Sequence, residues 1–90
     1  MFRITEEAAA LAAFKLSDSG APPGAVIRLV AREGGVVLEA GPIEPGDVAF
    51  EYEGRPVVAL SSALADDLRR IALQVERTDH GGQLQLRECG

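Results

Sequence analysis

The residue best suited to metal or redox chemistry is Cys89, the only cysteine in the 90-residue chain. A thiolate there is a candidate metal ligand, or a reactive thiol that pairs across a dimer. Metal sites and metal clusters held by thiolates need about four ligands, whereas one chain supplies one thiolate and a dimer supplies two. The alternative is a free thiol near the end of the chain without a metal function. A lone cysteine also excludes a disulfide within the chain, which fits a reducing compartment.

Three other groups of residues offer candidates for catalysis or metal binding. His80 stands in Asp79-His80-Gly81-Gly82, a composition typical of a solvated turn, and the chain has no second histidine to complete a metal site. Asp66 and Asp67 are adjacent on an expected helix, so they point about 100° apart and cannot share a proton. Ser61 and Ser62 lack a visible His–Asp partnership, and helix capping explains them. No catalytic constellation results, so we expect a protein that is not an enzyme.

Charge and hydropathy exclude several classes of partner. Nine basic residues against fourteen acidic ones give a formal net charge of −5 and a pI of about 4.7. The basic residues are scattered, whereas nucleic-acid binding requires a clustered basic face. The acidity disfavours anionic membrane surfaces, no apolar run approaches the ~20 residues of a membrane span, and no signal-peptide pattern is present at the N-terminus. We therefore expect a cytoplasmic protein that binds neither nucleic acid nor membrane.

The N-terminal part of the chain contains the only long helix pattern. Residues 2–4 alternate like a short strand, and Thr5 predicts a helix N-cap because its hydroxyl can accept a free backbone N–H. The alanine-rich run to Leu16 has high helix propensity and predicts that a small-residue face packs on a sheet. Residues 17–24 are rich in Ser, Gly and Pro and form a connector. Few aromatic residues are available for the core, and we expect the bulky members to be Phe14, Phe50 and Tyr52.

The rest of the chain has the two-residue period of strands. Gly34-Gly35 between residues 25–32 and 36–40 predicts a tight hairpin because both glycines can take positive φ. A second hairpin is expected over residues 48–60, and Ser61 or Ser62 caps a short helix over residues 63–70. Residues 71–76 and 83–87 complete the set of strands. We expect one domain over residues 1–90, mainly β with α+β character. It would be a small sandwich or partly closed barrel of mostly antiparallel strands with an N-terminal helix and one short helix.

Four segments match a known family in order and spacing. The matching residues are Ile4-Thr5-Glu6-Glu7-Ala8-Ala9, Val26-Ile27-Arg28-Leu29-Val30, Gly46-Asp47-Val48-Ala49-Phe50-Glu51-Tyr52-Glu53-Gly54-Arg55-Pro56-Val57-Val58 and Ser61-Ser62-Ala63-Leu64-Ala65. Together they make the chain resemble HesB-like, A-type iron–sulfur carrier domains over nearly its whole length. The resemblance implies the HesB-like fold, a mainly β sandwich with an N-terminal helix.

The functional part of the family pattern is where the sequence departs. A-type carriers hold iron or a cluster with three cysteines, one in a Gly-rich loop after the first long strand and two in a Cys-Gly-Cys motif near the C-terminus. Here the loop position is a short turn, Arg32-Glu33-Gly34-Gly35-Val36, without cysteine. Glu88-Cys89-Gly90 resembles the tail motif, but Arg87 stands where a partner thiolate would be. Cys89 is therefore the one residue carried over as a metal ligand.

Two functions follow from these observations, and the sequence leaves both open. The first is a divergent HesB-like protein related to iron–sulfur cluster assembly, unable to carry a cluster through the usual three cysteines and acting through an assembly or client protein. The alternative is a structural or protein-interaction module that kept the fold without any metal function. No cofactor is expected, with iron or an iron–sulfur cluster at Cys89 as the exception. A homodimer is plausible because residues 83–87 form an edge strand that can pair with a second copy.

Overall fold

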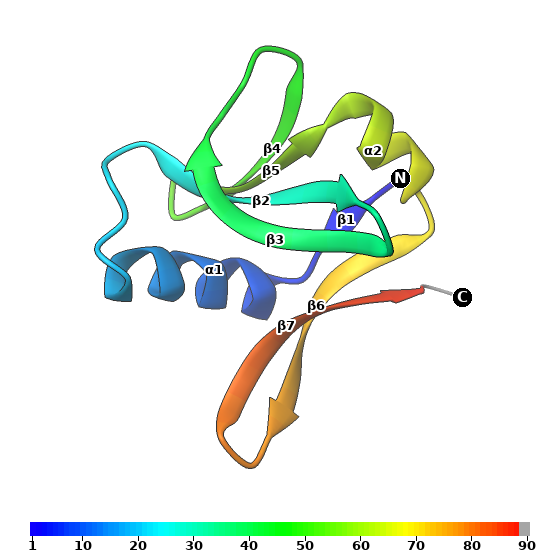
Figure 1. Cartoon of the computed structure of the whole chain (residues 1–90). Helices are drawn as coiled ribbons and strands as arrows, with labels where there is room; N and C mark the ends of the chain where they lie inside the picture. Colours follow the sequence, from blue (N-terminus) through cyan, green and yellow to red (C-terminus); the bar gives the residue numbers. More distant parts are fainter. Residues whose placement is uncertain (89–90) are drawn as a thin grey trace.

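The computed structural model describes residues 1–88, which form seven strands and two helices (Figure 1). In chain order the elements are β1 (Arg3–Ile4), α1 (Glu6–Asp18), β2 (Ala25–Arg32), β3 (Gly35–Pro42), β4 (Asp47–Tyr52), β5 (Arg55–Ser61), α2 (Ser62–Asp67), β6 (Ile71–Thr78) and β7 (Gly81–Glu88). Neither helix in this part of the chain has the length and apolar character needed to cross a bilayer.

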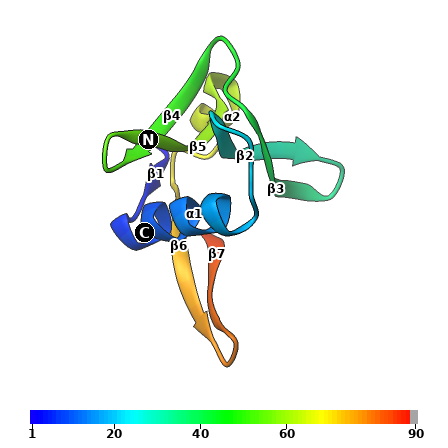
Figure 2. The ribbon, with the colours of Figure 1, turned by 90° about the vertical axis from the view of Figure 1, so that its left-hand side faces the viewer.

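The strands form two mixed sheets that do not close into a barrel. One sheet has the order β1-β6-β7 and the other has the order β3-β2-β5-β4. The three hairpins β2–β3, β4–β5 and β6–β7 are antiparallel, whereas β1–β6 and β2–β5 are parallel. Helix α1 contacts strands of both sheets, as Figure 2 shows. The prediction of a mainly β, mostly antiparallel sandwich with an N-terminal and a short helix is confirmed, and the barrel alternative is not.

Helix α1 begins as predicted and packs through its alanines. The hydroxyl of Thr5 accepts a hydrogen bond from the backbone N–H of Ala8 at 3.1 Å. The buried residues of the helix are Ala8, Ala9 and Ala12, which lie on one face because a helix turns about 100° per residue. Small side chains on this face let the helix axis come close to the strands beneath it.

The aromatic part of the core differs from the prediction. Phe14 is 64% exposed, because it lies two residues, about 200°, beyond Ala12 and therefore on the opposite side of α1. Phe2, just before β1, is buried in its place. Its ring meets that of Phe50 edge-on, with centroids 5.7 Å apart at an interplanar angle of 73°. Phe50 and Tyr52 pack against the core as partly buried residues, as expected.

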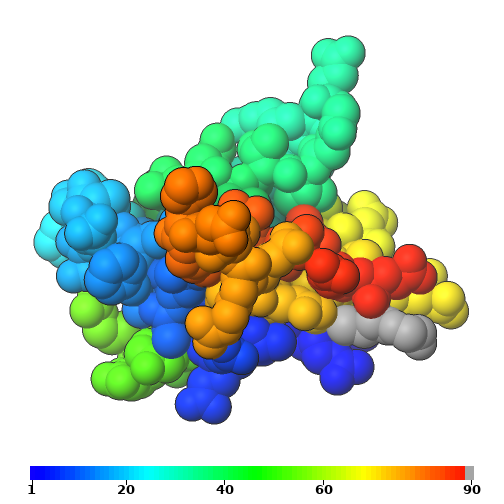
Figure 3. All heavy atoms as spheres, turned by 90° about the horizontal axis from the view of Figure 1, so that it is seen from below, coloured from blue at the N-terminus to red at the C-terminus, as the bar shows by residue number. Residues whose placement is uncertain are grey.

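Each hairpin closes through a two-residue loop. The β2–β3 loop is Glu33-Gly34, because Arg32 pairs with Gly35; the predicted loop Gly34-Gly35 was wrong by one residue. Gly34 and Gly35 nevertheless both have positive φ, as expected. This hairpin, coloured cyan to green, stands out from the body of the molecule in Figure 3.

The short helix α2 is capped as predicted but ends earlier. The hydroxyl of Ser61 accepts from the backbone N–H of Leu64 at 3.1 Å, so Ser61 rather than Ser62 is the N-cap. The helix ends at Asp67 and not at residue 70. Its last turn tightens, since the N–H of Arg69 bonds the carbonyl of Asp66 at 3.2 Å.

Candidate functional site

The resemblance to A-type carriers implies metal ligands at two places that are far apart in this sequence. The first is the loop between β2 and β3. In the structure it is a closed two-residue turn, and neither it nor the strands beside it contain a thiolate. The second is the segment that follows β7, which contains Cys89. Cys89 lies outside the described residues, so the prediction that it ligates a metal stays a prediction.

The other residues that suggested chemistry do not converge. His80 is exposed in the β6–β7 turn, where its backbone N–H donates to the Thr78 hydroxyl at 3.2 Å. Asp66 and Asp67 are exposed on α2. In the sequence, strand β6 separates them from the turn that contains His80. Within residues 1–88, no group of three or more His, Cys, Asp and Glu side chains is placed to hold a metal ion. Together with the lone cysteine, this donor set does not fit an iron–sulfur cluster.

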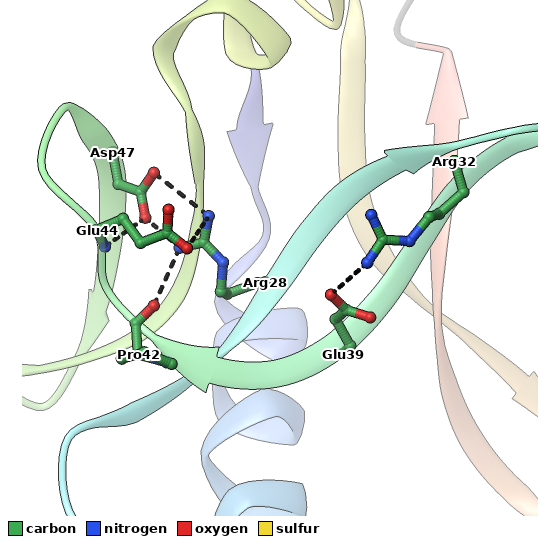
Figure 4. Close-up of polar contacts among 6 residues, drawn as sticks. All are labelled: Arg28, Arg32, Glu39, Pro42, Glu44 and Asp47. Carbon is green, nitrogen blue, oxygen red and sulfur yellow. Dashed lines mark hydrogen bonds and ion pairs between the residues drawn. The ribbon is translucent and has the colours of Figure 1, made fainter.

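The most organised polar cluster lies around Arg28, near the middle of β2 (Figure 4). Its guanidinium pairs with the carboxylate of Asp47, the first residue of β4, and donates to the carbonyl of Pro42 at 3.2 Å. Glu44, in the loop between β3 and β4, approaches the guanidinium at 3.8 Å and donates its backbone N–H to Asp47 at 2.9 Å. The cluster therefore fixes the path of the β3–β4 loop. We call these four residues the Arg28 clasp.

Burial makes the Arg28 clasp unusual for a surface ion pair. The side chains of Arg28 and Asp47 are only 12% and 3% exposed. The hydrogen bond from Arg28 lowers the pKa of Asp47 below its ordinary value, and the backbone N–H of Glu44 adds to this effect, while burial opposes it. The hydrogen bond to Asp47 likewise raises the pKa of Arg28. Both groups therefore stay charged around neutral pH.

Three hydrogen bonds from the guanidinium of Arg28 go to partners within the chain. The carboxylate of Asp47 and the carbonyl of Pro42 already occupy the guanidinium, and Glu44 adds a second negative charge beside it. Such an arrangement repels an anionic ligand and is self-contained, so we interpret it as structural. The sequence patterns did not predict that Arg28 and Asp47 come together. The available signal was an arginine at the centre of an apolar strand, together with an aspartate placed directly after Pro45-Gly46.

Two hollows flank the Pro22-Pro23 segment of the α1–β2 connector. The first, of about 490 Å³, lies between the end of α1 and the β4–β5 hairpin, and its polar lining residues include Ser17, Tyr52 and Arg55. The charge of Glu53 raises the pKa of Tyr52 above its ordinary value of 10.0. The second hollow, of about 540 Å³, is lined by apolar and glycine residues of the connector and the end of β3. In neither hollow does the described structure place a nucleophile beside a base.

Comparisons with known proteins identify the fold. No family model and no curated protein matches the chain. Several solved structures match, and two of them, which cover nearly the whole of this chain, share the HesB-like fold of A-type carriers. One is Escherichia coli SufA, involved in biosynthesis of iron–sulfur clusters, with a TM-score of 0.74 and 18% identity over 97% of this chain and 84% of SufA. The other is IscA with the [2Fe-2S] cluster, with a TM-score of 0.61 and 19% identity over 98% of this chain and 85% of IscA. The chain therefore has the fold that the resemblance implied.

Proposed function

We propose that this chain is a divergent relative of the A-type carriers that serves iron–sulfur cluster assembly through contacts with other proteins, without holding a cluster through three cysteines. The observation that carries the proposal is the combination of a carrier-like fold with a single cysteine in 90 residues. Because fold alone does not determine function, the proposal also rests on the ligand count, since one cysteine is too few for self-sufficient carriage of a cluster.

The geometry of the β2–β3 turn supports the same proposal. A cluster ligand on this hairpin needs a loop long enough to carry a thiolate toward the ligands from the C-terminal tail. Here Arg32 and Gly35 pair directly and leave only Glu33 and Gly34 between them. Glu33 is not a typical ligand for iron in a cluster, which is held by thiolates and in some cases by histidine, and Gly34 has no side chain.

The proposal extends to compartment, chemistry and partners. We propose a cytoplasmic protein that is not an enzyme and binds neither nucleic acid nor membrane, since its net charge is −5 and its candidate catalytic groups are dispersed. Its partner would be a protein that assembles clusters or receives them. The interaction module outside this pathway remains the second candidate, because nothing in the described structure replaces the missing ligands.

An anaerobic reconstitution tests the proposal. The purified chain and its Cys89→Ser variant are incubated with ferrous iron, sulfide and thiol reductant, desalted, and measured for visible absorption and for iron and sulfide content. We expect neither protein to retain a chromophore. A chromophore in the native chain that disappears in Cys89→Ser would contradict the proposal and restore a carrier function with Cys89 as ligand.

A strain that lacks this protein distinguishes a role in iron–sulfur cluster assembly from an interaction module outside that pathway. If the chain serves cluster assembly, its deletion lowers the specific activity of iron–sulfur enzymes relative to metal-free enzymes in the same extract. Expression of either the native chain or Cys89→Ser restores the activity, because the proposed role does not use the thiol. Unchanged activities in the deletion strain would favour the interaction module outside the pathway.

A further inference from the structure

The two sheets end in four edge strands, and within residues 1–88 three of them are protected against an added strand. β1 has only two residues. β4 is packed by α1 and α2 and carries a register shift between Phe50 and Glu51. β7 is packed by α1 and has polar side chains at Gln83 and Gln85. Short length, irregular register, covering helices and polar side chains block edge pairing, which leaves β3 as the open edge.

The β3 edge offers a regular row of backbone groups. The strand is eight residues long, and in the described chain only β2 packs extensively against it. The two-residue loop closes on the hydrogen-bonded pair of Arg32 and Gly35, and such pairs alternate along the ladder. Val36, Leu38 and Ala40 therefore direct their backbone N–H and C=O groups away from β2. No hydrogen bond among the described residues involves these groups.

The side chains along this edge are apolar, and an apolar hollow continues the row. Val37 and Leu38 are 40% and 37% exposed, and Val36 and Ala40 lie on the same side of the strand as Leu38. The hollow of about 540 Å³ beside the Pro22-Pro23 connector is lined by the end of β3 from Ala40 onward and by Ile43, which is 40% exposed. An extended segment that follows β3 therefore reaches a space able to take one large apolar side chain.

Negative charge lies at both ends of this edge and not along it. The single charged residue of β3, Glu39, is neutralised by Arg32 on β2 at 3.0 Å. At the start of β3, Glu33 in the turn is exposed and has no ion-pair partner among the described residues. Just after β3, the Arg28 clasp sets two carboxylates against one guanidinium, so Glu44 is left as excess negative charge.

This distribution of charge favours a segment that is apolar in its middle and basic at its ends. One cation of such a segment would lie near Glu33 and the other near Glu44, both of which lack a full counter-charge. A second copy of this chain does not meet this requirement. In antiparallel pairing of β3 with β3, Glu33 of each copy would approach Glu44 of the other, so like charges would meet at both ends.

We propose that the outer edge of β3 binds an extended segment of a partner protein as an added antiparallel strand. The segment has a basic residue at each end and places an apolar side chain in the hollow beside Ile43. Main-chain hydrogen bonds to the three outward residues of β3 hold the segment, while the hollow and the two glutamates provide specificity. The inference rests on the proposed function for the existence of a protein partner, and it adds the surface and the chemistry that recognise that partner.

A nuclear magnetic resonance titration of the full, isotope-labelled chain in thiol reductant tests the proposal. The probe is the capped peptide acetyl-Lys-Leu-Thr-Val-Thr-Val-Thr-Val-Lys-amide. In the antiparallel register its valines lie opposite the three outward residues of β3, its leucine lies opposite Pro42, and its lysines lie near Glu44 and Glu33. One strand edge buries much less than the ~1,600 Å² of a standard interface, so we expect a Kd on the order of 0.1 mM. The largest shift changes and the slowed amide exchange should fall on Val36, Leu38 and Ala40.

Two control peptides act on the native chain, so their results do not depend on whether a variant folds. The first has glutamate in place of both lysines and therefore meets Glu33 and Glu44 with like charge. The second has an N-methyl group on each valine, which removes the three donors that face β3 while the charges stay. Each should bind about fivefold more weakly than the probe, or weaker still.

Two pairs of variants test the ends of the edge. Glu33→Lys should weaken binding of the probe about threefold or more, whereas Asp79→Lys should leave it unchanged. Asp79 is the matched control because each of these exposed residues is the first of a two-residue hairpin loop. Ile43→Ala should weaken binding by removing part of the hollow. Val48→Ala on β4, where Val48 is 36% exposed, is its control.

Several outcomes would overturn the proposal. They are a lack of saturable binding, shift changes confined to β7, equal binding of the N-methylated peptide, and equal effects of each variant and its control. Protection of the β3 amides that rises with protein concentration in the absence of peptide would assign the edge to a second copy and would also overturn it. The proposed function is tested separately by the iron–sulfur enzyme activities of the deletion strain, so it can stand if the peptide fails to bind.

Discussion

Replacement of Asp47 by asparagine removes the charge that neutralises Arg28 while nearly conserving the shape of the side chain. In the native chain the Asp47 carboxylate is 3% exposed and bonds both the guanidinium and the N–H of Glu44. In Asp47→Asn the amide oxygen could still accept a hydrogen bond from the 12%-exposed guanidinium, beside the carbonyl of Pro42 at 3.2 Å, but the nearest negative charge would be the carboxylate of Glu44 at 3.8 Å. The variant therefore leaves a nearly buried cation without a close counter-charge.

The magnitude follows from this burial. Removing one member of a buried ion pair costs about 3–5 kcal/mol, and the contacts left to Arg28 place Asp47→Asn at about 3 kcal/mol, the lower end. For a domain of this size, that loss lowers Tm by about 15 °C. Asp67→Asn makes the same chemical change at an exposed position and should alter the free energy of unfolding by less than about 0.5 kcal/mol.

Urea denaturation followed by circular dichroism measures both variants, and its pH dependence gives a second test. Because Arg28 lowers the pKa of Asp47 in the folded chain, the stabilisation is complete above the ordinary aspartate value of 3.8. It is lost as pH falls below that value through the folded-state pKa. Asp47→Asn should therefore destabilise the chain at pH 7 and have a smaller effect near pH 2. An effect at pH 7 within about 0.5 kcal/mol of Asp67→Asn would refute the structural interpretation of the Arg28 clasp.

Two further predictions concern the aromatic residues. Phe2→Ala should lower the free energy of unfolding by about 3–5 kcal/mol because Phe2 is buried, whereas Phe14→Ala at an exposed position should change it by less than about 1 kcal/mol; equal losses in chemical denaturation would contradict the packing of α1. Glu53→Gln should lower the pKa of Tyr52 toward its ordinary value of 10.0, as measured by ultraviolet titration of the phenol, because the charge of Glu53 is the main cause of its elevation. Glu51→Gln is the control, and an equal shift there would argue against the assignment.

Local signals in the sequence predicted most elements of the fold. Thr5 was predicted as a cap, and Ser61 as one of two candidates, because a hydroxyl before a helical run has a specific backbone partner; the structure contains both bonds. Two of the three hairpins, β2–β3 and β4–β5, were predicted from glycines between strand patterns, since glycine marks positions of positive φ. In the β4–β5 turn, Glu53 as well as Gly54 has positive φ, which a glycine-based signal identifies only in part.

Features that depend on distant parts of the chain were not predictable in this way. The parallel pairs β1–β6 and β2–β5 join strands far apart in sequence, so no turn motif marks them. The Arg28 clasp brings together residues 19 positions apart across two strands and a loop. The exposure of Phe14 depends on which face of α1 the sheets cover. They cover the alanine face, where the helix can lie closer to the strands than an aromatic ring would allow. The candidate ligand Cys89 stays a prediction, since the described residues end at Glu88.

We propose that this chain combines the fold of an A-type carrier with too few ligands to hold an iron–sulfur cluster. Native mass spectrometry under strictly anaerobic conditions tests it most directly, on protein isolated from cells that produce it together with an intact cluster-assembly system. We expect all ions of this chain to have the mass of the polypeptide alone. Ions that include two iron and two sulfide atoms, and that are absent from the Cys89→Ser protein, would contradict it.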